Sequence, residues 1–204
     1  MAKSIPYQNG MVVVITAGLL RVSFKRLELH QAREKMEAKN PLILTLRLDE
    51  GSQRFLNAMR QKHFPLERNF LKAHLTLFHQ LADNEETFKI ISKVERNPFE
   101  MGVFKLINLG AGVAYKVESS ELESLRDELK AAFAKDLIPQ DKQGYRAHIT
   151  IQNKTTPEKA RALMAELSLD FKPLFVDAHG LDLWEYLGGP WLHRAYYEFG
   201  HFDR

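Results

Sequence analysis

The 204-residue chain contains no cysteine. It can therefore form no disulfide bond, no thiolate metal site and no cysteine nucleophile. Nothing in the composition requires an oxidising compartment, so we expect a cytoplasmic protein. An apolar run at residues 11–20 has only ten residues, too few to span a bilayer. A signal peptide is also disfavoured, because a single lysine precedes the run and no clear small-residue cleavage site follows it. We therefore expect no membrane partner.

The chain also lacks a broad excess of positive charge, although its pI is about 9.0. Residues 1–40 carry seven cations and three acids, whereas the remainder carries 22 cations and 23 acids. The larger part of the chain is close to neutral, which argues against a strong electrostatic surface for duplex nucleic acid. A local basic patch stays open.

The first forty residues differ from the rest of the chain. We interpret residues 1–40 as an N-terminal extension that is not part of the native fold, because Met36 opens a sensible protein start, MEAKNPLILTLRL. On this interpretation residues 1–35 are an upstream or added tail. The alternative is a genuine extra strand followed by a helix over residues 24–39. We place the folded domain at residues 41–204.

From residue 41 the hydrophobic periodicity predicts the same order of elements twice. The first half has strands at 42–48, 73–78 and 102–109 and helices at 51–63 and 84–96. The second half has strands at 113–117, 146–151 and 175–184, helices at 119–135 and 156–167, and a further strand at 192–199. Corresponding elements are 71 to 74 residues apart. We predict an α+β fold of two duplicated βαβαβ lobes, 41–112 and 113–204, related by a pseudo-twofold axis around a central groove between two sheets.

One six-residue phrase recurs in both halves. Residues 72–77 read KAHLTL and residues 146–151 read RAHITI, with the two histidines 74 positions apart. On a strand, residues two apart share a face, so the histidine and threonine of each phrase point away from its aliphatic residues. Two such faces across a groove suit phosphoryl chemistry, with one imidazole as base, the other as acid and hydroxyl donors for the phosphate oxygens. This chemistry requires no metal ion, and the sequence offers no compact carboxylate–histidine cluster.

This pair of His-x-Thr motifs resembles the 2H phosphoesterase superfamily, and most closely its bacterial branch of 2'-5' RNA ligase-like and cyclic phosphodiesterase proteins. The resemblance covers about residues 41–200. It implies His74 and His148 as catalytic residues and Thr76 and Thr150 as ligands of the substrate phosphate. It further implies cleavage of a 2',3'-cyclic or 2'-5' phosphodiester without a metal or other cofactor. By the family's usual polarity His148 is the general base and His74 the general acid, although the two could be reversed.

Three further residues are candidate substrate contacts. Lys72 and Arg146 share the face of the motif histidines but lie at its edge, so a solvated strand end is an equally good interpretation. Tyr115 could stack on a base, with core packing as the alternative. We expect His79 to be a loop residue, with a place on the groove wall as the alternative. The aromatic residues around the turn at 187–190 are expected to form a cross-strand cluster.

Two rival functions stay open. A site that opens a cyclic phosphate with water could join RNA ends through a 2'-5' bond in the reverse direction. The chain could also bind RNA ends without turnover, although intact motifs in both halves argue against this. In each case the expected partners are RNA ends or small cyclic nucleotides, and we expect a monomer.

Overall fold

In a computed structural model of the protein, the described residues are 3–6, 12–15 and 39–200. The chain divides into two units, residues 1–39 and 40–204, which are described separately. In the first unit, β1 (Lys3–Pro6) pairs antiparallel with β2 (Val12–Ile15). The helix predicted over residues 24–39 lies, but for its last residue, outside the described part of the chain.

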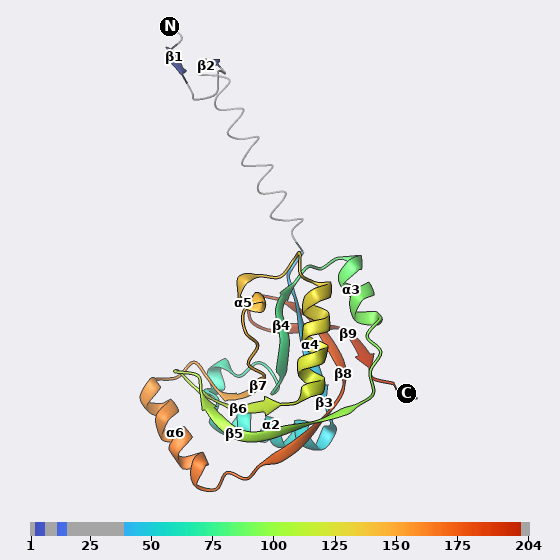
Figure 1. The fold of residues 1–204 in the computed structure, drawn as a ribbon. Helices are drawn as coiled ribbons and strands as arrows, with labels where there is room; N and C mark the ends of the chain where they lie inside the picture. Colours follow the sequence, from blue (N-terminus) through green and yellow to red (C-terminus); the bar gives the residue numbers. More distant parts are fainter. Residues whose placement is uncertain (1–2, 7–11, 16–38, 201–204) are drawn as a thin grey trace. The chain divides into compact units, whose positions relative to one another are not determined.

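The second unit holds the elements of the predicted domain (Figure 1). Its strands are β3 (Leu42–Leu48), β4 (Leu75–Leu81), β5 (Phe99–Asn108), β6 (Val113–Glu118), β7 (His148–Gln152), β8 (Leu174–Tyr186) and β9 (Trp191–Glu198). Its helices are α2 (Glu50–His63), the 3-10 turn η1 (Leu66–Arg68), α3 (Glu85–Ser92), α4 (Ser120–Ala132), α5 (Pro139–Lys142) and α6 (Pro157–Leu169). Among the described residues, no helix is both long enough and apolar enough to cross a bilayer.

The seven strands of this unit form one antiparallel sheet in the order β3-β4-β7-β6-β5-β8-β9. The long strand β8 also pairs with β3: residues 174–178 pair with β5 and residues 178–185 with β3. The predicted α+β class is confirmed, but the strands of the two halves form one sheet and not the two expected on either side of a groove. The third strand of each half lies beside the first strand of the other half, so β3 lies between β4 and β8, and β6 lies between β7 and β5. Two units related by a twofold axis would pair in this way, and the axis itself stays a prediction.

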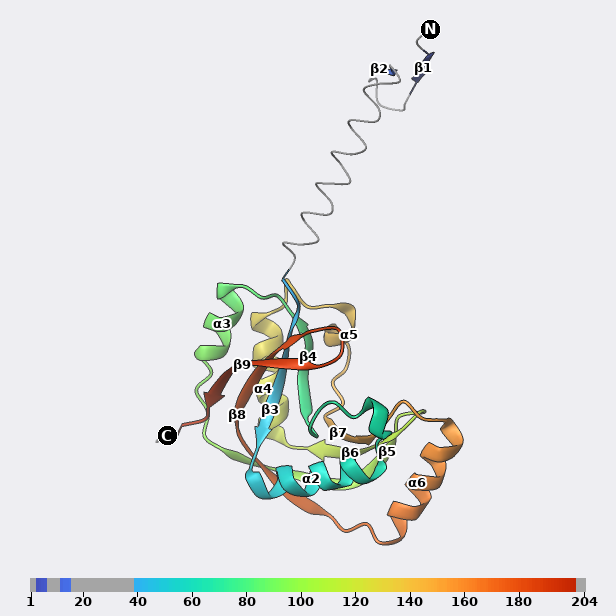
Figure 2. The ribbon, with the colours of Figure 1, turned by 180° about the vertical axis from the view of Figure 1, so that it is seen from behind.

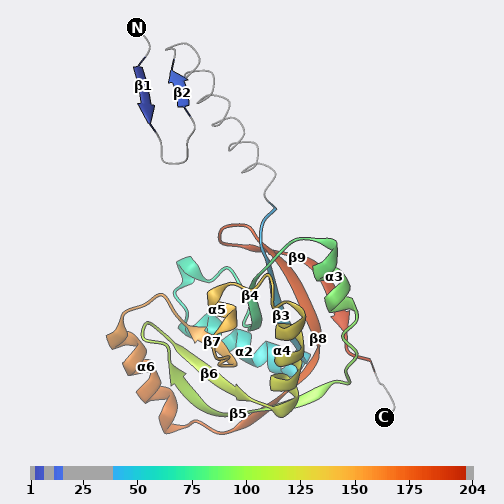
Figure 3. The ribbon, with the colours of Figure 1, turned by 45° about the horizontal axis from the view of Figure 1, so that its top comes forward.

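Helices cover the sheet across the two halves. Helix α2 of the first half packs against β7 of the second, and α6 flanks β5 (Figures 2 and 3). Helix α4 of the second half lies over β4 of the first, where Phe133 meets Phe78 edge to face with ring centroids 5.5 Å apart. Leucines of β3 and β4 such as Leu42 and Leu75 are fully buried beneath these helices. The shared core therefore ties both motif strands to rigid elements.

Local sequence signals explain where the helices begin. Asn84, Ser119 and Thr156 each accept a hydrogen bond from the backbone N–H three residues on, as N-cap residues do. The predicted helices begin at these positions. The sequence prediction did not include η1 or α5, because elements of three and four residues are too short to show a hydrophobic period.

Candidate active site

The two His-x-Thr strands lie side by side in the sheet. Leu75 of β4 pairs directly with Ile149 of β7. Along both strands the aliphatic residues are buried, while the histidines and threonines between them are partly exposed. One pocket of about 740 Å³ is lined by all four motif side chains, His74, Thr76, His148 and Thr150. The structure thus brings together residues from both halves of the chain, as the alternation predicts.

Both motif imidazoles are held in the same way. Nδ1 of His74 lies 2.7 Å from the main-chain oxygen of Lys72, and Nδ1 of His148 lies 2.6 Å from that of Arg146. A carbonyl oxygen can only accept, so Nδ1 carries the proton in each ring and donates it. The other nitrogen, Nε2, is left for chemistry in the pocket. It is a proton acceptor in the neutral ring and a donor in the charged ring.

The surroundings of His74 favour its neutral form. Burial lowers the pKa of His74 to about 4, and the nearby charges of Arg60, His148 and His79 act in the same direction. Its hydrogen bond to a main-chain carbonyl opposes them. The ring of Trp191 lies against His74, with centroids 4.7 Å apart, and adds to the burial that disfavours the charged imidazole. At neutral pH His74 therefore holds no positive charge in the unliganded site.

Two buried arginines hold the motif strands in place. Arg60 of α2 donates from Nη1 to the main-chain oxygen of Thr150 at 2.9 Å. Arg126 of α4 donates from Nε to the main-chain oxygen of Leu77, also at 2.9 Å. Each arginine belongs to one half of the chain and binds the motif strand of the other. Both are at most 5% exposed. Sequence reasoning missed them because an arginine in an amphipathic helix normally reads as a surface residue.

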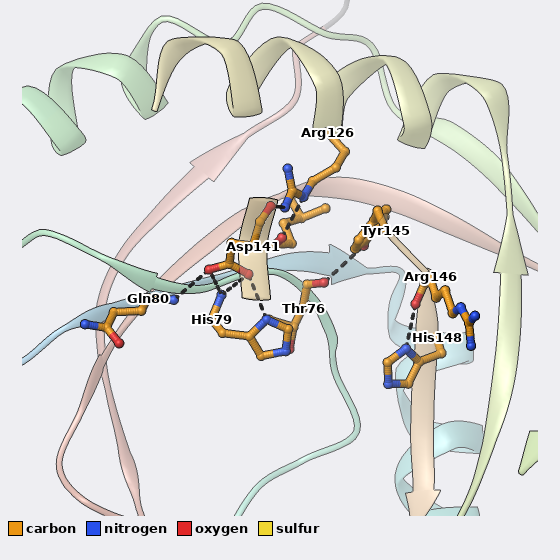
Figure 4. Close-up of polar contacts among 9 residues, drawn as sticks. Thr76, His79, Gln80, Arg126, Asp141, Tyr145, Arg146 and His148 are labelled. Atoms are coloured by element: carbon orange, nitrogen blue, oxygen red, sulfur yellow. Dashed lines mark hydrogen bonds and ion pairs between the residues drawn. The ribbon is translucent and has the colours of Figure 1, made fainter. Parts of the chain in front are cut away.

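A third anchor is Tyr145, whose hydroxyl donates to the main-chain oxygen of Thr76 at 3.0 Å (Figure 4). Burial raises the pKa of this tyrosine, so it stays neutral and keeps its donor. Tyr145 also lines the pocket. Tyr145, Arg60 and Arg126 together hold the main chain from which the hydroxyls of Thr76 and Thr150 project.

The three candidate substrate contacts lie in different places in the structure. Arg146 lines the pocket with the motif histidines, whereas Lys72 lines an adjoining pocket that includes His74. Tyr115 is a correction: it is 4% exposed and its ring lies 6.3 Å from that of Phe55, away from the motif pocket. The reason is register, because Tyr115 pairs with the core-facing Ile149. The alternative of core packing is the one that holds.

One other expectation changes, and one holds. His79 is not in a loop, since β4 continues to Leu81, and its side chain lines the motif pocket. The aromatic cluster forms, with Trp184 and Trp191 at a centroid distance of 6.2 Å and Trp184 Nε1 donating to Thr45 Oγ1 at 2.8 Å. Trp191 additionally lines the motif pocket. Within residues 39–200, no three histidine or carboxylate side chains are grouped to hold a metal ion.

The paired His-x-Thr strands and the antiparallel α+β sheet are the features expected of the 2H phosphoesterase superfamily. Sequence comparison agrees: the family described as the "2'-5' RNA ligase superfamily" matches residues 48–190. The chain belongs to this superfamily. No curated protein matches it.

Solved structures share the fold. Escherichia coli LigT complexed with 3'-AMP is 14% identical, with a TM-score of 0.56 over 80% of this chain and 99% of LigT. TT0787 of Thermus thermophilus is 18% identical, with a TM-score of 0.54 over 78% of this chain and 97% of TT0787. A structure described as a phosphoesterase is 14% identical, with a TM-score of 0.56 over 79% of this chain and 99% of its own.

Proposed function

We propose that the protein is a metal-independent phosphoesterase that acts on 2',3'-cyclic phosphate or 2'-5' phosphodiester bonds of RNA or nucleotides by acid–base catalysis between two histidines. The observation that carries the proposal is the pocket shared by His74 and His148, in which main-chain carbonyls bind both Nδ1 atoms and leave both Nε2 atoms for the substrate. Thr76 and Thr150 supply hydroxyl donors in the same pocket.

In the proposed reaction one imidazole removes the proton from water as its oxygen attacks phosphorus. The other imidazole gives a proton to the ribose oxygen as its bond to phosphorus breaks. The low pKa of His74 favours this residue as the base, because it is neutral before substrate binds. His148 is then the acid. This is the reverse of the polarity that the family resemblance suggests.

The two threonines are proposed to donate to the non-bridging phosphate oxygens, whose negative charge must be stabilised through the transition state. Their main chains are held by Tyr145 and Arg60, so the hydroxyls are positioned before substrate arrives. Solved structures of E. coli LigT contain 3'-AMP, phosphate, ATP or NADP+. These ligands all carry phosphate, which supports a nucleotide or an RNA end as the substrate here.

The superfamily match also supports the reverse reaction, in which an RNA end with a 5'-hydroxyl replaces water and a 2'-5' bond forms. The same two proton transfers would run in the opposite direction. A nicked RNA with a 2',3'-cyclic phosphate end distinguishes the two activities by its product: ligation gives a longer chain, and hydrolysis gives a chain of unchanged length with an opened phosphate.

The test is incubation of the purified protein with nucleoside 2',3'-cyclic phosphates and cyclic-phosphate-ended RNA, with and without EDTA. We expect ring opening that EDTA does not affect, and phosphorus NMR should show a phosphate left on the 2' oxygen. Turnover that is lost in EDTA and restored by a divalent ion would contradict the mechanism. Tight binding of RNA ends without product would support the non-catalytic alternative.

A further inference from the structure

The motif strand β4 contains a bulge directly after its threonine. Thr45 pairs with Thr76, but Leu44 pairs with Phe78, so one extra residue is inserted in β4 at this point, and a second register shift follows, since Leu42 pairs with Leu81. Leu77 and Phe78 are consequently both buried, which breaks the alternation. In a regular strand, residue 79 would face away from His74, since five positions separate them. The bulge turns the His79 side chain back to the motif face.

The second motif strand has the same irregularity. Ala114 pairs with Thr150, but Val113 pairs with Gln152, and Ile151 and Gln152 are both buried. The residue that follows, Asn153, lines the same pocket as His79. Both halves therefore deliver a polar side chain to the pocket five positions after the motif histidine. Because only the first half uses a histidine here, this position sets the two halves apart.

A buried carboxylate orients His79. Asp141 Oδ1 lies 2.9 Å from His79 Nδ1, and the same carboxylate accepts from the backbone N–H groups of His79 and Gln80 (Figure 4). The Asp141 side chain is 2% exposed, whereas that of His79 is 46% exposed. With Nδ1 bound to Asp141, the free polar edge of His79 is Nε2 at the pocket wall.

The wall around His79 is rich in donors. It includes the amide side chains of Gln140 and Gln143. Its only acid, among the residues described, is Asp141, which is already bound by His79 and two backbone N–H groups. Arg126 lies behind it and donates from Nη2 to the main-chain oxygen of Asp141 at 2.7 Å, so its charge offsets the carboxylate. The charges of Arg126 and Asp141 balance, so this end of the pocket carries no net negative charge that would repel a phosphate.

The position of His79 suits a second phosphate. Allowing for the bulge, it lies two strand steps beyond Thr76, about 7 Å at ~3.3 Å per step. This is close to the spacing of neighbouring phosphates along a nucleotide chain. A pocket of about 740 Å³ is also larger than one phosphodiester requires.

We propose that His79, oriented by Asp141, binds a second phosphate group of the substrate and makes the enzyme selective for substrates that carry one. The inference rests on the proposed function, since the first phosphate is the one between His74 and His148. The second phosphate is either a phosphate monoester on a small nucleotide or the next phosphodiester of an RNA chain.

The experiment compares three substrates: adenosine 2',3'-cyclic phosphate, the same compound with a 5'-phosphate, and a dinucleotide ending in a 2',3'-cyclic phosphate. The wild-type protein should show a KM about tenfold lower for at least one substrate with a second phosphate, the size expected for a charge-assisted hydrogen bond. His79→Gln should remove this preference and leave KM for the singly phosphorylated compound within about twofold. The substrate that loses affinity identifies the source of the second phosphate.

Gln80→Ala is the matched control, because it alters an exposed neighbour whose backbone N–H, but not side chain, is bound to Asp141. It should keep the wild-type preference. An unchanged preference in His79→Gln, or an equal loss on all three substrates, would overturn the inference and leave His79 a structural partner of Asp141.

A binding experiment tests the inference separately from the proposed function. Calorimetry with adenosine 2'-phosphate and adenosine 2',5'-bisphosphate requires no turnover. If the wild-type protein cleaves none of the substrates, the proposed function fails, and the inference then stands or falls on whether His79→Gln selectively weakens binding of the bisphosphate.

Discussion

Arg60 Nη1 donates to the main-chain oxygen of Thr150, which lies 90 residues further along the chain. The guanidinium also donates from Nε to Asn69 Oδ1 and to the main-chain oxygen of Leu71, just before the first motif. One buried side chain therefore connects helix α2, the approach to the first motif and the threonine of the second. The relative position of the two motif strands depends on this contact.

Arg60→Met should lower the free energy of unfolding by about 3 kcal/mol, because it leaves buried acceptors without a donor. It should also reduce kcat, since Thr150 loses its anchor. Chemical denaturation and steady-state kinetics measure the two effects. Arg54→Met on the same helix is the control, because Arg54 is exposed and its contact with Glu50 is 3.4 Å long. Arg54→Met should change stability by less than about 0.5 kcal/mol.

The lowered pKa of His74 predicts how stability depends on pH. A histidine whose folded pKa is about 4, against an ordinary value of 6.5, binds fewer protons folded than unfolded between these pH values. The wild-type protein should therefore lose stability as pH falls from about 6.5 to about 4. His74→Gln should reduce that loss. Unfolding temperatures of the wild-type protein and the variant at pH 7 and pH 5 measure this; equal losses would show that His74 titrates normally.

The acid and the base can be told apart by the leaving group. A p-nitrophenyl phosphodiester releases a stable phenolate that needs little protonation, so the variant lacking the acid should retain more of its activity on this substrate. When the leaving group changes from ribose oxygen to nitrophenolate, the activity of His148→Ala, as a fraction of wild type, should rise more than that of His74→Ala. Recovery of His74→Ala instead would restore the polarity that the family resemblance suggests.

Deletion of residues 1–35 should leave the folded domain and its activity intact. All the motif and pocket residues, and the buried hydrophobic residues among those described, lie between residues 42 and 199. The truncated protein should keep its unfolding temperature and kcat/KM. An insoluble product, or one without a cooperative thermal transition, would show that the N-terminal segment belongs to the core.

The sequence predicts those helices and strands whose apolar residues recur at a regular spacing. Alternation around His74 and His148, and the offset between the halves, identify both motif strands and the face on which their histidines and threonines lie. The same alternation already favours the core for Tyr115, because Val113, Tyr115 and Val117 share a buried face while Lys116 and Glu118 on the other face are partly exposed. The register against Ile149 places that face on the core side of the sheet.

The parts of the site that sequence reasoning missed depend on irregularities. The His79 side chain lies on the pocket side of the sheet because a bulge in β4 shifts the alternation of side chains. In a regular strand it would point to the opposite face. Its partner Asp141 lies on α5, a helix of four residues with no periodic signal. Arg60 and Arg126 each lie four residues after a buried leucine, Leu56 and Leu122, so helical spacing places them on the buried faces of α2 and α4, while their charge argues for the surface.

The most direct test of acid–base catalysis by two histidines is the hydrolysis of a nucleoside 2',3'-cyclic phosphate by His74→Ala, His148→Ala and the double variant, all in EDTA. Each single variant should lose about a hundred- to ten-thousand-fold in kcat. The double variant should be scarcely slower than the slower single variant, because the two imidazoles act as a unit. Near wild-type turnover by either single variant, or a double variant that multiplies the two losses, would contradict the account.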